Sequence, residues 1–308
     1  MKKWVLKAVV QKTISYLPGG QSINYLFQKY VTKGIYLTDE YFFDRLSHAK
    51  THIESYITLA GTKPLNNTLE IGTGWYPIVP ISLFLSGANN INTIDISELL
   101  TKKSFATAIE RFLEAEKKGE LAKYIEVMPE RLAVLKKLRE DYDTTPFEQI
   151  LATLKIKYLL KDARHTGLPD KSFDLISSNN TFEHIYADIL EGILIEFKRI
   201  TRSGGVMSHA IDMSDHFAHF DKRINVFNFL QFSDAQWNMI DNSIQPQNRL
   251  RVSDFRALYK KLNIPVTTEK VIVGNLNELN AIKLDDKYSE LDISDIAAVE
   301  CYFASLIQ

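Results

Sequence analysis

Residues 68–77 constrain the fold more than any other part of this chain. They read T-L-E-I-G-T-G-W-Y-P: a short apolar run, two glycines one residue apart, and then an apolar helical pattern that begins at Ile78. Gly72 and Gly74 permit backbone angles that other residues avoid, and they leave room for a ligand against the main chain. The pattern predicts a strand, a tight turn and a helix, with a ligand bound over the turn.

A second apolar run, from Ile91 to Asp95, ends in a carboxylate 21 residues after Gly74. A carboxylate in this position can accept hydrogen bonds from both hydroxyls of a ribose that lies over a glycine turn. No third glycine follows Gly74, although a dinucleotide site needs one to seat a pyrophosphate on the helix N-terminus. Glu70 adds a negative charge, which would repel phosphates and suits the ammonium of a methionine moiety. These residues predict an adenosine-containing cofactor.

Residues 68–77 resemble motif I of the class I S-adenosylmethionine-dependent methyltransferases, with Tyr76 in the place of the last glycine of that motif. Later segments resemble the same family in the same order. Residues 159–164 resemble the loop that contacts adenine, 172–180 the fourth strand, 181–185 the start of the next helix, and 197–206 a helix, a glycine turn and the fifth strand. The resemblance extends over residues 66–212 and the C-terminal strands.

The resemblance implies S-adenosyl-L-methionine as the cofactor and indicates which residues bind it. Asp95 is expected to bind the ribose, and Asp162 is placed to accept a hydrogen bond from the exocyclic amine of adenine. The expected cofactor-binding residues are Glu70, Gly72, Thr73, Gly74, Asp95, Ile96, Asp162, Ala163 and Asn179.

The expected fold is α/β, a Rossmann-like sheet of seven strands that is mostly parallel. Strands and helices alternate from residue 68 to 212, which implies parallel strands with right-handed crossovers. The runs at 266–273 and 297–306 resemble the antiparallel hairpin that closes this family's sheet. We expect an N-terminal helical cover at 1–62, with helices at 2–17, 23–31 and 39–59. A methyltransferase domain would then occupy residues 63–308.

Two segments of that domain are longer than a simple alternation requires. The 66 residues between Asp95 and Asp162 are about twice what one helix and one strand need. The surplus, at about 107–155, is rich in Lys, Glu and Leu at helical spacing and predicts inserted helices, with a short strand at 124–128. Residues 212–250 are aromatic and polar, and we expect them on the substrate side. A helix is expected at 253–262.

Composition excludes several classes of protein. The net charge of −1 gives no general attraction to nucleic acid. The single Cys301 lies in an apolar run, so we expect a buried thiol in a strand and a reducing, cytoplasmic location. No run of 18 apolar residues or signal-peptide pattern is present in the sequence.

One cluster of polar residues follows the fourth strand. The spacing predicts Asn180, Glu183 and His184 on one turn of a helix, and His209 of the fifth strand could approach the same point. Such a set could bind Mg²⁺ or Mn²⁺, although two imidazoles favour softer metals. The Glu-His pair could also simply tether the helix. We expect catalysis without a metal and keep Glu183, His184 and His209 as the alternative metal site.

A second cluster, D-M-S-D-H-F-A-H-F-D at 212–221, follows the fifth strand. A hydroxyl nucleophile needs a base poised near neutral pH, and a histidine backed by a carboxylate supplies one. His216 with Asp212 or Asp215 meets this requirement, although the same pattern can cap a helix. The expected catalytic residues are His216, Asp212, Asp215, His184 and His219.

The first 38 residues carry six lysines and no other charge. Such a segment can lie on an anionic membrane surface. The alternative, which we expect, is a helix that covers the cofactor site and keeps its lysines solvated on the outer face. Membrane contact through residues 1–20 stays open.

These patterns predict an O-methyltransferase that acts on a small molecule, a sugar or a glycan intermediate that could be lipid-linked. Aromatic and amide side chains at 227–249 are a mixture that often binds sugars. The alternatives are an N- or C-methyltransferase that acts on another metabolite, and a noncatalytic module that binds S-adenosylmethionine or NAD.

Overall fold

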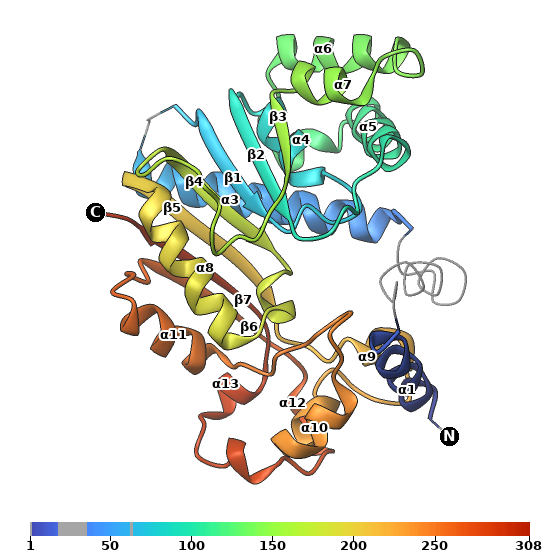
Figure 1. Cartoon of the computed structure of the whole chain (residues 1–308), viewed down its shortest axis with the longest axis vertical. Helices are drawn as coiled ribbons and strands as arrows, with labels where there is room; N and C mark the ends of the chain where they lie inside the picture. Colours follow the sequence, from blue (N-terminus) through green and yellow to red (C-terminus); the bar gives the residue numbers. More distant parts are fainter. Residues whose placement is uncertain (1, 18–35, 62–63) are drawn as a thin grey trace.

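The computed structural model describes residues 2–17, 36–61 and 64–308. At its centre lies a seven-stranded sheet of order β3-β2-β1-β4-β5-β7-β6 (Figure 1). Strands β1 to β5 are parallel, and β7 runs antiparallel to both β5 and β6. The predicted fold class is therefore confirmed. The strands are β1 Asn67–Ile71, β2 Asn90–Asp95, β3 Ile156–Leu160, β4 Phe173–Asn179, β5 Thr201–Asp212, β6 Thr268–Val273 and β7 Ala298–Leu306.

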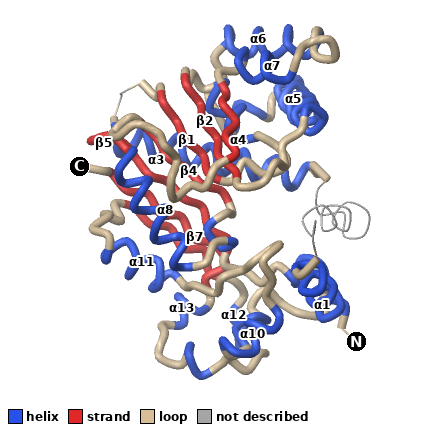
Figure 2. Tube along the Cα trace, in the orientation of Figure 1, coloured by secondary structure: helices blue, strands red, loops and turns tan. Residues whose placement is uncertain are grey.

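Helices cover both faces of the sheet (Figure 2). Helices α3 (Asp39–Ala60), α4 (Ile78–Leu85) and α5 (Lys102–Lys117) bury one apolar cluster, which includes Phe42, Phe84 and Phe112. Helices α8 (Ala187–Ile200) and α11 (Val252–Lys261) bury a second cluster on the other face. Because both faces are covered, β4 is buried along its whole length, as is typical of a central parallel strand.

The inserted segment after α5 is helical, with the 3-10 turn η2 (Leu121–Lys123) followed by α6 (Pro129–Glu140) and α7 (Phe147–Thr153). The strand expected at 124–128 is wrong. Ile125 is buried and Tyr124 stacks on Phe43 of α3, so the apolar residues of this run serve packing against a helix. In the described sheet, β2 has β1 on one side and β3 on the other, and residues 124–128 are not part of the sheet.

Strand β5 begins earlier than expected. The predicted glycine turn at 204–205 lies inside β5, where the register shifts between Phe173 and Leu175 of the neighbouring strand. Gly204 has a φ of 75°. A Cβ on Gly205 would lie 2.8 Å from the carbonyl oxygen of Phe173, so the two glycines form a bulge rather than a turn.

A third apolar cluster lies below the sheet in Figure 1, among α1 (Lys3–Ser15), α9 (Phe217–Phe220), the 3-10 turn η4 (Asn228–Gln231), α10 (Asp234–Ile240), α12 (Leu276–Asn280), the 3-10 turn η5 (Asp286–Tyr288) and α13 (Ile293–Ile296). Helix α1 was expected to cover the glycine turn. It packs instead against α9 and α10 and so covers the substrate-side segment. The N-terminal part of α3 takes its place at the glycine turn, because Tyr41 packs edge-on against Tyr76. The helix expected at 23–31 lies outside the described residues.

Among the described helices, none combines the length and the apolar character needed to cross a bilayer. Cys301 is fully buried in β7, as predicted, and burial raises the pKa of its thiol to about 12.

Candidate functional site

The predicted site residues gather at one edge of the sheet because β1 to β5 are parallel and their carboxyl ends meet there. Ile71 of β1 pairs with Ser178 of β4, and Asn179 pairs with Ala210 of β5. Strand order reverses at β1, whose neighbours are β2 on one side and β4 on the other. Ligands of open α/β sheets bind outside the carboxyl ends at this reversal.

The two glycines of the turn after β1 have different roles. Gly72 and Gly74 have φ values of 83° and 63°, as the sequence predicts. A Cβ on Gly72 would lie 2.2 Å from Oγ1 of Thr181, so Gly72 lets the turn pack against the loop after β4. Among the residues that the structure describes, a Cβ on Gly74 would meet no atom closer than 4.0 Å. The open space for a ligand therefore lies at Gly74 and not at Gly72.

Asp95, at the end of β2, faces this turn. Its Oδ2 accepts a hydrogen bond from the amide of Gly74 at 3.1 Å, and its Oδ1 accepts one from the amide of Ser97 at 3.1 Å. Burial raises the pKa of Asp95, and these two hydrogen bonds counteract part of that rise. Each carboxylate oxygen can accept a second hydrogen bond, so Asp95 keeps the capacity to bind a diol. Ile96, the next residue, is 79% exposed.

Glu70 belongs to a buried network rather than to an open surface. Its carboxyl accepts hydrogen bonds from Nδ2 of Asn179 at 2.9 Å and from Oγ1 of Thr93 at 3.1 Å. Nε2 of His52 lies 2.8 Å from Oδ1 of Asn179. Burial raises the pKa of Glu70 to about 8 and lowers that of His52 to about 3. Both ends of the Asn179 amide are thus engaged by protein groups.

The network includes residues that the sequence interpretation missed. Nδ1 of His52 lies 2.7 Å from Oγ of Ser208, and Nε2 of His48 lies 3.1 Å from Oε1 of Glu300. The spacing of His48 and His52 places both on one face of α3, and this spacing is the signal that could have identified them. At the turn, Oγ1 of Thr73 lies 2.5 Å from Oγ1 of Thr93, so the network reaches the predicted cofactor contacts.

The predicted adenine loop follows β3. Asp162 forms an ion pair with Arg164, which donates to both carboxyl oxygens, and this pairing lowers the pKa of Asp162. Ala163 beside it is buried.

Asp212, at the end of β5, lies between two imidazoles. Its Oδ2 is 3.2 Å from Nε2 of His216 and 3.9 Å from Nε2 of His219. Burial opposes ionisation of Asp212, but hydrogen bonds from the two histidines hold its pKa well below its ordinary value. The carboxylate is therefore ionised at neutral pH and can stabilise a protonated imidazole.

Asp215 is not a partner of His216. It is fully buried, accepting hydrogen bonds from Nδ2 of Asn228 at 2.8 Å and from the amide of Phe217 at 2.7 Å. Both bonds hold the chain where α9 begins, so the structure gives Asp215 a structural contact and not the predicted pairing with His216, and its catalytic role stays a prediction.

The residues after β4 form a 3-10 turn, η3 (Phe182–His184), and not the predicted first turn of a helix, which begins at Ala187. Glu183 is 2% exposed, and burial together with the charge of Asp212 raises its pKa well above the ordinary value. Nδ1 of His184 lies 2.7 Å from the carbonyl oxygen of Pro246. Burial lowers the pKa of His184 to about 4.

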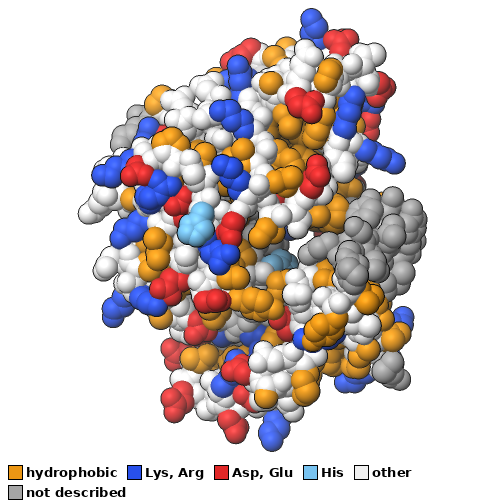
Figure 3. Space-filling model, viewed as in Figure 1, with side chains coloured by type: hydrophobic (Ala, Val, Ile, Leu, Met, Phe, Trp, Pro, Cys, Tyr) orange, Lys and Arg blue, Asp and Glu red, His pale blue; other side chains and the backbone are white. Residues whose placement is uncertain are grey.

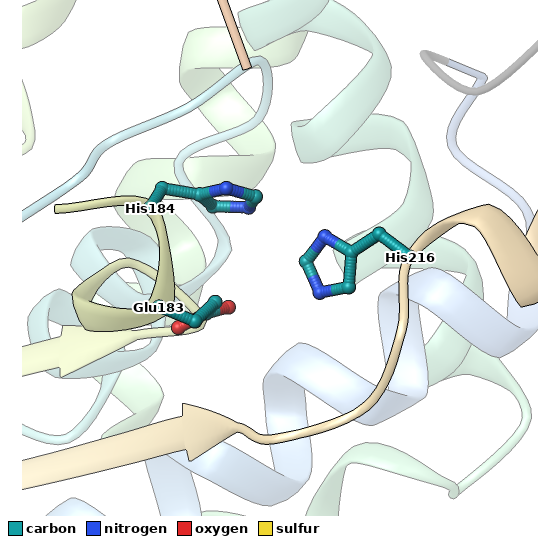
Figure 4. A group of neighbouring side chains, drawn as sticks. All are labelled: Glu183, His184 and His216. Carbon is teal, nitrogen blue, oxygen red and sulfur yellow. The ribbon is translucent and has the colours of Figure 1, made fainter. Parts of the chain in front are cut away.

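Glu183, His184 and His216 point toward one another across a small gap (Figure 4). One nitrogen or oxygen atom of each lies within 4.8 Å of those of the other two. The rings of His184 and His216 are 4.8 Å apart and nearly perpendicular.

His209 does not reach this gap, so the structure does not bring it together with Glu183 and His184 in the alternative metal set. It lies three residues before Asp212 in β5, and side chains at this separation point to opposite faces of a sheet. Its ring stacks on Phe182 at 4.4 Å, and its Nδ1 lies 2.8 Å from Oγ of Ser178.

Two of the N-terminal lysines face the protein, contrary to the expectation that all are solvated. Nζ of Lys12 donates to the carbonyl oxygens of Asn238 at 3.0 Å and Asp241 at 2.7 Å. Nζ of Lys7 lies 5.6 Å from the ring centre of Phe217.

A small hollow borders His216. The face of the molecule in Figure 3 is indented near its middle, with hydrophobic side chains above and below. Side chains of α1, α9, α10 and the segment after α10 line the hollow: Lys7, Gln11, His216, Phe217, Trp237, Asp241, Asn242, Gln245 and Gln247.

Comparison with known protein families gives one match. The family described as "Methyltransferase domain" matches residues 109–208, which run from α5 to β5 and include Glu183 and His184. Residues 109–208, about a third of the chain, are therefore similar to a methyltransferase domain. A curated relative, the malonyl-[acyl-carrier protein] O-methyltransferase of Hamiltonella defensa, is 33% identical over 86 residues, which cover 26% of this chain. The match spans about a third (33%) of that protein's length.

Solved structures of similar shape are also methyltransferases. One is phosphoethanolamine N-methyltransferase 2 of Haemonchus contortus in complex with S-adenosyl-L-methionine (12% identity, TM-score 0.44, 91% of this chain and 59% of that chain). Another is geranyl diphosphate C-methyltransferase of Streptomyces coelicolor A3(2) (9% identity, TM-score 0.46, 84% of this chain and 79% of that chain). The sheet order described above, and not this likeness, establishes the fold.

Among the described residues, the glycine turn after β1 leaves room for a cofactor. The space over Gly74 is open, and a side chain there would intrude on a ligand. The exposed Ile96 offers an apolar surface beside Asp95, where an adenosine could lie. The residues present therefore fit S-adenosylmethionine.

Proposed function

We propose that this chain transfers a methyl group from S-adenosylmethionine to a hydroxyl of a small-molecule acceptor, and that the acceptor is a sugar or a glycan intermediate. The observation that carries the proposal is a shared edge of the sheet. The turn at Gly74 follows β1, and Asp95 beside it ends β2. The two imidazoles lie at Asp212, which ends β5, a strand of the same parallel set. A cofactor and an acceptor can therefore meet there.

Bound over the turn, S-adenosylmethionine supplies a methyl group on a positively charged sulfur. The chain positions the acceptor oxygen in line with that methyl and takes up its proton. An imidazole held by Asp212, either His216 or His219, accepts this proton. The ionised carboxylate of Asp212 then stabilises the imidazolium.

The enclosed space beside His216 is only about 20 Å³, enough for one water, so the support for a sugar acceptor is the chemistry of its rim and not its volume. An indole ring and several amides line it, and sugars are often bound by flat apolar faces next to planar polar groups. Some of these amides also hold the protein together, since Nε2 of Gln11 donates to Oε1 of Gln245 at 3.0 Å. The hollow would therefore present a fixed hydrogen-bonding pattern to its ligand.

Two measurements test the proposal. Calorimetry should detect micromolar binding of S-adenosylmethionine and S-adenosylhomocysteine and no binding of NAD. Incubation with sugars, nucleotide sugars and lipid-linked saccharides should release S-adenosylhomocysteine with a hydroxyl-bearing acceptor. Tight NAD binding without a response to S-adenosylhomocysteine would contradict the cofactor, and turnover with amine acceptors alone would contradict the hydroxyl.

A further inference from the structure

The carboxylate of Glu183 lacks partners in the described structure. Glu183 is 2% exposed, and neither of its oxygens has a hydrogen-bond donor. A buried carboxylate without donors or a cation is costly, because burial removes its hydration and nothing replaces it. This position therefore calls for either a proton or a cation.

The two histidines across the gap each have one ring nitrogen engaged. Nδ1 of His184 faces the carbonyl oxygen of Pro246 at 2.7 Å, and Nε2 of His216 faces Oδ2 of Asp212 at 3.2 Å. Metal-binding histidines typically donate their second ring N–H to a carbonyl or a carboxylate, which fixes the tautomer and aims the other nitrogen. Nε2 of His184 and Nδ1 of His216 are thus the nitrogens left for a ligand.

We propose that Glu183, His184 and His216 bind a first-row divalent cation, Zn²⁺ or Mn²⁺, in the gap seen in Figure 4. Two imidazoles and one carboxylate are a donor set of catalytic zinc and related transition-metal sites, and the hard cation Ca²⁺ prefers oxygen ligands alone. One ligand atom of each residue lies within 4.8 Å of those of the other two, and these separations would have to shorten for all three to bind a cation at about 2.0–2.2 Å.

The cation would act on the acceptor, and this role rests on the proposed function. Three protein ligands leave coordination positions open, and His216 also borders the hollow proposed for the acceptor. A hydroxyl oxygen bound to the cation loses its proton more readily. With His216 engaged as a ligand, His219 is the imidazole at Asp212 that receives this proton.

Equilibrium dialysis of the chelator-treated full chain against ZnCl₂ and MnCl₂ tests the site directly. One equivalent per chain is expected for one of the two cations, and Glu183→Gln should weaken its binding by at least about 10- to 100-fold. Glu191→Gln is the matched control, because it removes a carboxylate of α8 that is paired with Lys261 and is not part of the proposed site. This variant should bind the cation like the parent.

The variant also separates a cation from a proton. Glutamine resembles a protonated glutamate, so if Glu183 simply holds a proton, Glu183→Gln will match the parent in cation uptake and in melting temperature with added cation. That result, or full methyl transfer in excess chelator, would overturn the site. Methyl transfer to a hydroxyl acceptor by the chelator-treated chain would show that the proposed function stands without the cation.

Discussion

Oδ2 of Asp95 accepts a hydrogen bond from the backbone amide of Gly74 at 3.1 Å. The bond joins the end of β2 to the turn after β1. The carboxylate expected to bind a ribose therefore also fixes the turn over which that ribose would lie. A change at Asp95 therefore removes the hydrogen bond that holds the turn, together with the ligand contact that we predict for this carboxylate.

Asp95→Ala should weaken S-adenosylhomocysteine binding by about 1.5–3 kcal/mol, the scale of hydrogen bonds to a charged group. Calorimetry measures this as a rise in Kd of about 10- to 150-fold. Asp143→Ala, which removes an exposed carboxylate in the loop after α6, should leave Kd unchanged. Equal affinity in all three proteins would mean that Asp95 does not bind the ribose.

Alanine at the two glycines should have different effects. Gly72→Ala brings a methyl group within 2.2 Å of Oγ1 of Thr181, so we expect a clear fall in melting temperature, partly restored by Thr181→Ala in the same chain. Gly74→Ala meets no such contact and carries only the backbone cost of a positive φ, about 1 kcal/mol. Its main effect should be weaker cofactor binding. Similar losses of stability in both variants would contradict the assignment of open space to Gly74.

Asp212→Asn and Asp215→Asn form a matched pair, because the two carboxylates are three residues apart and only Asp212 faces the histidines. Asp212→Asn should lower kcat by about 10²- to 10⁴-fold with a small change in melting temperature, since a neutral amide cannot stabilise an imidazolium. Asp215→Asn should instead lower stability, because Asp215 accepts bonds from Asn228 and Phe217. The reverse pattern would place the proton acceptor at Asp215.

Glu70 should make the stability of the fold depend on pH. Its pKa is about 8 in the folded chain against an ordinary value of 4.5, so between these values the folded state holds a proton that the unfolded state has lost. Its contribution to stability is therefore complete below pH 4.5 and is lost as pH rises to about 8, with a slope of at most about 1.4 kcal/mol per pH unit.

Urea unfolding of the parent and of Glu70→Gln between pH 5 and 8 isolates this effect. Glutamine does not titrate. The free energy of unfolding of the variant, relative to that of the parent, should therefore rise steadily with pH. A constant difference between the two proteins across this range would show that Glu70 is already ionised at pH 5.

Helix α1 should act through packing rather than through its charge. Trp4 is buried against Phe217 and Phe232, so Trp4→Ala should cost about 3 kcal/mol in unfolding free energy. Lys2→Gln with Lys3→Gln should change neither stability nor activity, since both side chains are exposed. Vesicle sedimentation at low salt that these two changes abolish would show instead that the segment binds anionic lipid.

The fold could be predicted because its information is local. Apolar residues recur in each core strand, the glycine turn follows β1 directly and Asp95 ends β2, so sequence spacing places them. The run at 124–128 has the same composition as a strand, but its neighbours in the fold are helices, which composition alone does not indicate.

The contacts of the site depend on long-range geometry and were harder to predict. Which carboxylate meets His216 is decided by the loop after β5, and the bond between His52 and Asn179 joins residues 127 positions apart. The sequence could have predicted that His209 does not join Glu183 and His184. It lies three residues before Asp212 in one strand, so the two side chains point to opposite faces of the sheet.

The third apolar cluster, centred on Trp4, Phe217, Phe229 and Trp237, is separate from the two clusters that hold the sheet. Cooperative units of this kind can open on their own while the rest of a protein stays folded. This unit borders the acceptor site proposed above, so we expect its local opening to leave the cofactor turn undisturbed. Laboratory evolution toward new acceptors should therefore introduce its substitutions in this unit.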